Sequence, residues 1–486
     1  MNKVFFLFET RKDCLNKDDS IETRKICLNK EDLIEQKKLF EQLTKKEKEE
    51  KMYMTKLKQV LRNVAFLLAA TIAFTACGGG SDDPTPDPEP TPTPTPTPST
   101  TESRGLVVFC MGSGTGLQDE MDKNITRIVE AASKVVDDNN KICIFYDRVY
   151  DANNKNHETY TRLTEVKKVD GRTKQVLVKE WNPSQTSTVD PTFMTEVLTL
   201  ARQTMNVKQY GLVMSSHGGG WVPSDTYDQY VIEENKLNSQ NDAKGASVKV
   251  PLTKFFGEDS GAFMEVPQLA QALKAAGQWQ YVIFDACFMS SVEALYDLRS
   301  VAPYIVASPA EVMSGGFPYS TMVPLLFGKD NTPTSLENVC RAYMDSYKNS
   351  SATVALIQTD RLQALADIVK QINANPATVD ANKLQGFEGF HPHLYFDFEQ
   401  YVKALGANSD NASLLAKFRT SLGEAVLFEA HTSSILSGAG SNKGTVKIDN
   451  CCGLTCHVPA PTFTGFSFDF VHEAWLKTDW AKAVTK

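Results

Sequence analysis

A histidine and a cysteine each follow an apolar run with the length of a buried strand. His217 ends the stretch LVMSSH (212–217), and three glycines follow it, while Cys287 comes directly after YVIFDA (281–286). In α/β proteins with parallel sheets, binding sites form outside the carboxyl ends of the strands, so we expect both side chains to share one crevice. A thiol beside an imidazole can attack a carbonyl carbon, because the imidazole can carry the proton that the thiol must lose.

We expect Cys287 to be the nucleophile and His217 to be the general base that later protonates the leaving amine. The glycines after His217 leave room for a substrate backbone, and the N–H groups of Gly218 and Cys287 are the expected donors to an oxyanion. A helix is expected to begin directly after Cys287, so that its N-terminus favours the thiolate. The alternative for each residue alone is structural, since a cysteine after an apolar strand is usually a buried hydrophobe.

Strand and helix patterns alternate from about residue 104, and these elements must position the two side chains. Five apolar runs have the length of buried strands and lie at 105–111, 141–147, 210–216, 281–286 and 304–308. A hairpin is expected over 161–181, with its turn near Asp170-Gly171, and Asp190-Pro191 is expected to open a helix that runs to Met205. Apolar strands that alternate with helices favour an α/β fold with a mostly parallel sheet covered by helices on both faces.

Two later segments follow the pattern less clearly. The polar segment 222–262 has little hydrophobic periodicity, and we expect it to be an insertion in the form of a loop. From about residue 320 onward the alternation of strands and helices becomes irregular. We therefore expect a catalytic domain over 104–320 and a C-terminal subdomain over 321–486.

The beginning of the chain resembles targeting signals more than a folded domain. Residues 1–51 are highly charged and repetitive, and we expect that they are not part of the natural protein. Residues 52–76 combine a basic start with an apolar run too short to span a membrane, which is typical of a signal peptide. Their end resembles a bacterial lipobox with Cys77 as the lipidated residue, and an ordinary secretory signal cut near Ala76 is the alternative.

The segment after the signal peptide has the composition of a tether. Residues 77–103 are rich in alternating Pro and Thr, which favours an extended, disordered linker over a packed core. The acidic stretch SDD (81–83) resembles surface-export signals of some Gram-negative lipoproteins. We therefore expect a cell-envelope lipoprotein that is held by lipid at the outer membrane and exposed on the cell surface.

The histidine and cysteine motifs together resemble one known family. SSHGGGW (215–221) and DACFMSS (285–291) are similar to motifs of the clostripain family of cysteine peptidases, whose fold is related to those of caspases, gingipains and legumains. The resemblance implies a caspase-like fold and an endopeptidase that cleaves after Arg or Lys in peptide or protein substrates. It also implies that His217 and Cys287 form the catalytic dyad.

The same resemblance implies where a basic substrate side chain binds. Asp285 is expected in the pocket for that side chain, where a carboxylate pairs with a cation, and the alternative is that Asp285 caps the following helix. Relatives often carry acidic residues directly after the Ala-Ser of the fifth strand, where this chain has Pro309 and Ala310. Glu311 is the expected substitute.

Family members are often processed by their own activity in a loop that follows the histidine motif. In the segment 222–262 the candidate cleavage sites follow lysines, namely Lys236, Lys244, Lys249 and Lys254. A flexible surface loop without any processing is the alternative.

Neither calcium nor zinc has a recognisable site in the sequence. Some relatives use calcium, but no oxygen-rich loop here has a recognisable ligand spacing, so we expect no cofactor. Cys451, Cys452 and Cys456 lie beside His457, yet their spacing matches no standard zinc pattern, and we expect core packing or a disulfide instead.

The charge and the remaining motifs argue against other classes of function. The formal net charge is −8 with both signs mixed along the chain, whereas nucleic-acid binding needs a concentrated basic face. GSGTG (112–116) is similar to a phosphate-binding loop, but Leu117 stands where a dinucleotide fingerprint needs its third glycine. A catalytically inactive, surface-exposed binding module on the same fold is the main alternative to a peptidase.

Overall fold

A computed structural model describes residues 102–149, 158–241, 256–438, 443–459 and 467–485. These residues fall in one compact unit that spans Pro98–Lys486. The expected signal peptide and lipidated Cys77 lie outside the described residues. Within the described residues, the chain has no helix with the length and apolar character that a membrane span requires.

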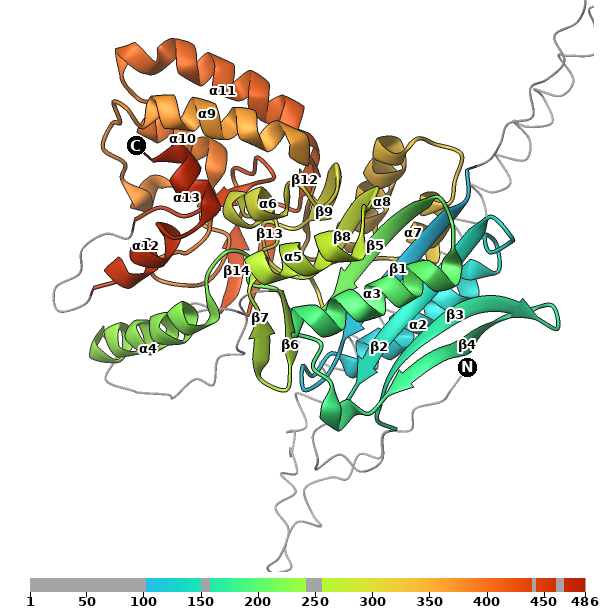
Figure 1. Cartoon of the computed structure of the whole chain (residues 1–486). Coiled ribbons are helices and arrows are strands. Elements are labelled where there is room, and N and C mark those ends of the chain that lie inside the picture. Colours follow the sequence, from blue (N-terminus) through green and yellow to red (C-terminus); the bar gives the residue numbers. More distant parts are fainter. Residues whose placement is uncertain (1–101, 150–157, 242–255, 439–442, 460–466, 486) are drawn as a thin grey trace, which may run out of the picture. The chain divides into compact units, whose positions relative to one another are not determined.

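A nine-stranded sheet with the order β12-β10-β9-β8-β5-β1-β2-β3-β4 forms the centre of the fold (Figure 1). Its strands are β1 Arg104–Met111, β2 Asn140–Arg148, β3 Tyr160–Val169, β4 Arg172–Trp181, β5 Gln209–Ser215, β8 Tyr281–Asp285, β9 Tyr304–Ala307, β10 Thr353–Gln358 and β12 Val426–His431. The five strands from β9 to β2 run parallel, while the pairs beyond them on each side are antiparallel. The expected parallel sheet is therefore confirmed at its centre, and the complete sheet is mixed.

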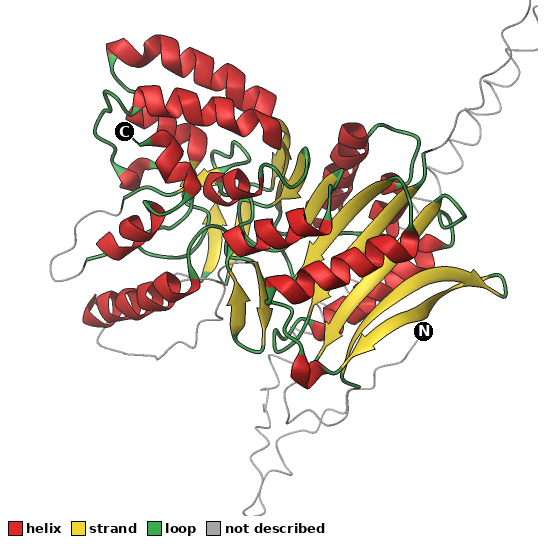
Figure 2. Ribbon diagram, in the orientation of Figure 1, coloured by secondary structure: helices red, strands yellow, loops and turns green. Residues whose placement is uncertain are grey.

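Helices cover both faces of this sheet, because the side chains of its central strands point alternately to two hydrophobic cores. In β1, Val107 and Phe109 belong to the core under α3 and α5, and Leu106 and Val108 belong to the core under α2 and α7. The ribbon shows helices on both faces of the sheet (Figure 2). The helices of the described chain are α2 Gln118–Ala132, α3 Pro191–Met205, α4 Ser224–Asn241, α5 Val266–Ala276, α6 Val292–Leu298, α7 Tyr319–Leu326, α8 Thr332–Tyr347, α9 Leu362–Ile372, α10 Phe398–Leu405, α11 Ala412–Ala425, α12 Asp469–Trp475 and α13 Asp479–Val484.

Two local signals produce the elements expected from them. Asp190 is the N-cap of α3, and its carboxylate accepts hydrogen bonds from the N–H groups of Thr192 at 2.7 Å and Phe193 at 3.4 Å. The β3–β4 hairpin turns at Asp170 and Gly171, whose φ angles of 51° and 74° are both left-handed, as a tight hairpin turn requires. Among the described strands, β4 pairs only with β3 and is one outer edge of the sheet.

We expected a loop over 222–262, but most of the described residues in this segment form a helix and a hairpin, so that prediction is wrong. α4 occupies the first part, and β6 Phe256–Asp259 pairs with β7 Ala262–Met264 in a hairpin at the end. α4 escapes a search for periodicity because its buried side chains, including Tyr227 and Tyr230, are few among many polar ones. Residues 242–255, with three of the four candidate lysines, lie outside the described residues.

The chain after residue 320 completes the sheet and adds a group of helices. β10 pairs with β9, and β12 pairs with β10, so the sheet itself continues across the expected domain boundary. α9, α11 and α13 pack together near α6 (Figure 1). The short strands of this part are β11 Phe396–Asp397, β13 Ser434–Ser437, β14 Gly444–Lys447 and β15 Thr455–Cys456.

Candidate active site

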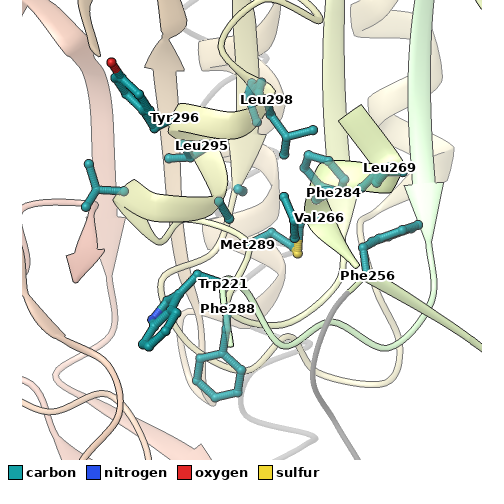
Figure 3. Packing of buried hydrophobic residues seen from close by; sticks show 14 of the residues in the cluster. Trp221, Phe256, Val266, Leu269, Phe284, Phe288, Met289, Leu295, Tyr296 and Leu298 are labelled. Carbon is teal, nitrogen blue, oxygen red and sulfur yellow. The ribbon is translucent and has the colours of Figure 1, made fainter. Parts of the chain in front are cut away.

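A cavity of about 340 Å³ lies at the carboxyl ends of β5 and β8, where the sequence predicts a site. His217, Cys287, Asp285 and Glu311 all line this cavity, so the four side chains singled out in the sequence come together. The strand ends rest on a firm core, since Phe284 of β8 and Met289 pack with Val266 of α5 (Figure 3).

His217 is held by backbone groups on two sides. The N–H of Gly257 in β6 donates to the His217 carbonyl oxygen at 3.0 Å, and ring atom Nε2 lies 2.9 Å from the carbonyl oxygen of Thr115. Because a carbonyl oxygen can only accept, Nε2 carries the proton and Nδ1 is the basic nitrogen of the neutral ring. Burial lowers the pKa of His217, which keeps the ring neutral at physiological pH.

Cys287 is half-buried and protonated at neutral pH. Burial, followed by the nearby Glu311 carboxylate, raises the pKa of the thiol to about 12, although the Val312 N–H donates to Sγ at 3.3 Å. α6 does not begin directly after Cys287 but at Val292, and Ser291 is its N-cap. The expectations that a helix N-terminus favours the thiolate and that Asp285 caps this helix are therefore wrong.

The turn after Cys287 explains the late start of the helix. Phe288 has a φ of 58°, which is rare and strained for a bulky residue, and its N–H donates to the Ala310 carbonyl oxygen at 3.0 Å. Because of this conformation the chain cannot pass directly from β8 into a helix at Cys287, and α6 begins only at Val292. The conformation leaves Cys287 in a turn at the cavity, where no hydrogen bond joins it to His217 within the described structure.

The glycines after His217 allow the two motifs to touch through their backbones. A Cβ atom on Gly218 would lie 2.4 Å from the Cys287 carbonyl oxygen and 3.0 Å from the Cys287 nitrogen. At Gly220, whose φ is 62°, a Cβ atom would lie 2.7 Å from the Phe288 carbonyl oxygen. The N–H groups of Gly218 and Cys287 thus lie on adjoining segments, and the glycines make room for the cysteine turn as well as for a substrate.

Asp285 lies at the inner wall of the cavity with 6% of its surface exposed. Its Oδ2 accepts a hydrogen bond from the Tyr319 hydroxyl at 2.7 Å, and a Cβ atom on Gly316 would lie 2.4 Å from the same oxygen. Burial raises the pKa of Asp285 to about 6, while the hydrogen bonds from Tyr319, Phe317 and Ser215 oppose that rise. With a pKa of about 6, the carboxylate is mostly ionised at neutral pH, and it lines the cavity.

Glu311 also faces the cavity, but its carboxylate is fixed by the C-terminal part of the chain. Its Oε1 accepts hydrogen bonds from the Ser437 hydroxyl at 2.7 Å and from the Gly438 N–H at 3.0 Å. Its carboxylate is therefore held at the cavity by these two groups.

Two site residues have no clear signal in the sequence. Glu120 of α2 is a third carboxylate on the cavity wall, but an acidic residue in the first turn of a helix is common and does not by itself indicate a site. Thr115 acts through its backbone carbonyl, to which any residue type could contribute. Through this carbonyl, its loop GSGTG (112–116) contacts the ring of His217.

The cysteines near the C-terminus are unpaired. Cys451, Cys452 and Cys456 are free thiols, so of the two expectations core packing is met and the disulfide is not: Cys456 lies in the core, and Cys451 and Cys452 pack against it. Across the described ranges, His, Cys, Asp and Glu side chains nowhere gather in threes as metal ligands.

Comparison with solved structures supports the fold. The chain is similar to a secreted C11 cysteine protease from Bacteroides thetaiotaomicron, "iotapain", with 24% identity and a TM-score of 0.63 over 79% of this chain and 99% of that one. It is also similar, over the same shares, to an inactive zymogen C11 protease from Parabacteroides distasonis, with 23% identity and a TM-score of 0.64. A third similar structure is a secreted C11 protease from Bacteroides thetaiotaomicron in complex with an irreversible peptide inhibitor, with 21% identity, a TM-score of 0.63 and the same shares.

Comparison with family models gives the decisive match. The clostripain family model matches residues 108–385, which is more than half of the 486-residue chain and includes both motifs. Comparison with curated proteins gives no match. From the family match and the α/β fold around the cavity, we conclude that the chain belongs to the clostripain family and is a cysteine-type peptidase.

Proposed function

We propose that this chain is an endopeptidase that cleaves peptide bonds after Arg or Lys, with Cys287 as nucleophile and His217 as general base and acid. One observation carries the proposal. A single cavity brings these two side chains together with the carboxylates of Glu120, Asp285 and Glu311, and none of the described residues that line it is Lys or Arg.

In the first half of the reaction the enzyme is acylated. Nδ1 of His217 takes the thiol proton as Sγ of Cys287 attacks the peptide carbonyl carbon, and a carbon–sulfur bond forms. The N–H groups of Gly218 and Cys287 donate to the resulting oxyanion. The imidazolium then protonates the leaving nitrogen, the carbon–nitrogen bond breaks, and the amine product departs.

In the second half water removes the acyl group. His217 accepts a proton from a water molecule while its oxygen attacks the thioester carbon, and the same two N–H groups stabilise the second oxyanion. The proton returns to Sγ as the carbon–sulfur bond breaks. The product is a carboxylic acid, and the neutral thiol and imidazole are regenerated.

The substrate side chain before the cleaved bond enters the same cavity. A guanidinium or ammonium group there can pair with these carboxylates, and its attraction to buried Asp285 is stronger than it would be at the surface. An acidic side chain would meet the like charges of Asp285 and Glu311, whereas Glu120 is already paired with Lys123 at 2.6 Å. This difference in electrostatic energy supports selection of Arg or Lys.

The proposal is tested with peptide reporters that carry Arg, Lys or a neutral residue before the cleaved bond. We expect hydrolysis of the basic reporters, and a loss of at least about 10³-fold in kcat in both Cys287→Ala and His217→Ala. Folding of the variants is checked by circular dichroism. If wild-type protein hydrolyses no reporter in a thiol-dependent way, the inactive binding module is the better account.

The proposal includes self-processing in the insertion after the histidine motif. Lys236 lies in helix α4, where its ammonium group pairs with Glu233 at 2.8 Å, so cleavage there would require the helix to unwind. Lys244, Lys249 and Lys254 are therefore the favoured sites. Wild-type protein is expected to separate into two fragments during incubation, whereas Cys287→Ala stays whole. Equal behaviour of the two would contradict self-processing.

We also propose that Cys77 carries a lipid that holds the peptidase at the outer membrane, with the linker placing it at the cell surface. The lipobox-like sequence and the Pro/Thr-rich linker support this location. Cys77→Ala is expected to move the protein from the membrane fraction to the soluble fraction. Retention of the variant in the membrane fraction would contradict a lipid anchor.

A further inference from the structure

We propose that Tyr395 is a positioning residue that holds the histidine loop (217–220) and the cysteine turn (287–291) in register. This role rests on the proposed catalytic dyad. It belongs to a residue that lies far from both motifs in the sequence, in the segment just before β11.

One side chain contacts both segments. The Tyr395 hydroxyl donates to the Gly219 carbonyl oxygen at 2.5 Å. Its ring stacks on Phe288, with centroids 4.5 Å apart and an angle of 11° between the planes. The polar end of the tyrosine therefore binds the histidine loop, and the apolar face binds the cysteine turn.

Both contacts fall where the backbone needs support. Phe288 is the residue with the left-handed φ of 58°, and a strained conformation persists only when its surroundings hold it. The stacked ring of Tyr395 covers the Phe288 ring, which lies near Trp221 at this end of the core (Figure 3). The histidine loop has three glycines in a row, and glycine restricts the backbone less than any other residue. A hydrogen bond to the Gly219 carbonyl fixes the orientation of the Gly219–Gly220 peptide plane, in addition to the bridge that joins Gly218 to Phe256.

Tyr395 is itself held in place by a buried carboxylate. Glu388 is fully buried and accepts hydrogen bonds from the N–H groups of Phe387 at 3.1 Å and Tyr395 at 3.2 Å. His393 Nδ1 lies 3.2 Å from the same carboxylate. These contacts of Glu388 hold the segment around Tyr395 in place. The Tyr395 side chain can therefore fix the positions of the histidine loop and the cysteine turn.

Tyr395 does not act on the substrate directly. It is fully buried and is not among the residues that line the cavity. Burial raises the pKa of its hydroxyl well above the usual value, so it remains a neutral hydrogen-bond donor. Its effect on catalysis passes along the glycine loop to Gly218, whose N–H lies two peptide groups before the Gly219 carbonyl and is proposed to donate to the oxyanion.

Because that oxyanion exists only during the reaction, loosening the loop affects turnover more than substrate binding. Tyr395→Phe keeps the stacked ring and removes only the hydroxyl. We expect kcat to fall about 10- to 100-fold for the best basic reporter, with KM within about twofold of wild type.

Tyr230→Phe is the matched control. Tyr230 is also fully buried, and its hydroxyl also donates to a backbone carbonyl, that of Pro392 in the same C-terminal segment, but it contacts neither catalytic segment through that bond. We expect Tyr230→Phe to lower Tm by as much as Tyr395→Phe while leaving kcat within about threefold of wild type.

The outcomes separate this role from the proposed function. A wild-type protein without hydrolysis of any reporter contradicts the proposed function. An active wild type together with an unchanged kcat in Tyr395→Phe overturns the positioning role, and so do equal falls in kcat in the two tyrosine variants. A selective fall in kcat in Tyr395→Phe supports it.

Discussion

At the scale of single residues, the proposed dyad consists of two uncharged groups in the resting site. Burial lowers the pKa of His217 and, with Glu311, raises the pKa of Cys287 to about 12. A thiolate–imidazolium pair is therefore disfavoured before substrate binds. The proton moves when the thiol attacks, and the hydrogen bond from Nε2 to Thr115 keeps Nδ1 ready to receive it.

The pKa of Asp285, raised to about 6, predicts a pH dependence that is specific to basic substrates. Protonation of Asp285 below this pH removes a negative charge from the pocket and weakens the binding of a cation. For an Arg reporter, kcat/KM is expected to fall as pH drops through 6, relative to a neutral reporter measured in parallel.

Asp285→Asn is the control for this pH dependence. It is expected to remove the difference between the two pH profiles, because the amide does not ionise. Identical profiles for both reporters in wild type would contradict a role of Asp285 in selecting a cation.

Gly218 gives a second prediction at this scale. Gly218→Ala places a methyl group 2.4 Å from the Cys287 carbonyl oxygen, so the two backbones must separate and the expected oxyanion donors move apart. We expect kcat to fall about 100-fold or more in the reporter assay. Gly423→Ala, in helix α11 where an added Cβ meets nothing within 4 Å, is expected to keep full activity. A Gly218→Ala enzyme as active as this control would show that the contact is unimportant.

At the scale of elements, the N-cap of α3 can be tested apart from the chemistry. Asp190→Ala removes the acceptor of two N–H groups and is expected to lower the free energy of unfolding by about 1 kcal/mol. Denaturant titration measures this change. Since Asp190 lies outside the cavity, kcat/KM is expected to stay within about twofold of wild type. A large loss of activity without a loss of stability would contradict a purely structural role.

Elements with strong local signals could be predicted from the sequence. Asp170-Gly171 and Asp190-Pro191 mark a turn and a helix start through their own backbone preferences, and the apolar runs mark the central strands. The same reasoning fails after Cys287, because the left-handed Phe288 delays the helix and depends on contacts from distant segments. It also misses α4, whose buried side chains are sparse.

The site could be predicted only where side chains carry the chemistry. His217, Cys287, Asp285 and Glu311 stand at strand ends and line one cavity. Thr115 contributes a backbone carbonyl, and Tyr395 reaches the loops from far along the chain, so neither has a pattern that spacing could reveal. Their positions follow from tertiary packing alone.

At the scale of the whole molecule, the last third of the chain completes the structure that carries the site. Residues from β10 enter both hydrophobic cores, with Ala355 and Ile357 in one and Val354 and Leu356 in the other. β9 would become an apolar outer strand if β10 were missing. The chain after residue 320 thus supplies strands to the sheet and also contacts that hold the catalytic loops.

A fragment of residues 104–320 is therefore expected not to fold by itself. It loses the partner of β9, the Tyr395 contacts and the groups that hold Glu311. Circular dichroism and denaturant titration are expected to show no cooperative transition, whereas residues 102–486 unfold cooperatively. A cooperative transition in the short fragment would instead establish a domain boundary near residue 320.

Strand β4, at the other edge of the sheet, affects whether copies of the protein associate at high concentration. β4 is ten residues long and has no neighbour beyond β3 within the described structure, and Leu177 on it is 56% exposed. A long unpaired strand of this kind can recruit a strand from another molecule and start aggregation. Arg172, Lys174 and Lys179 lie along β4, with Lys174 and Lys179 paired to Asp170 and Glu196, and charged side chains on an edge strand disfavour pairing with a further strand. We therefore expect the charged residues of this hairpin to limit strand pairing between copies at high local concentration.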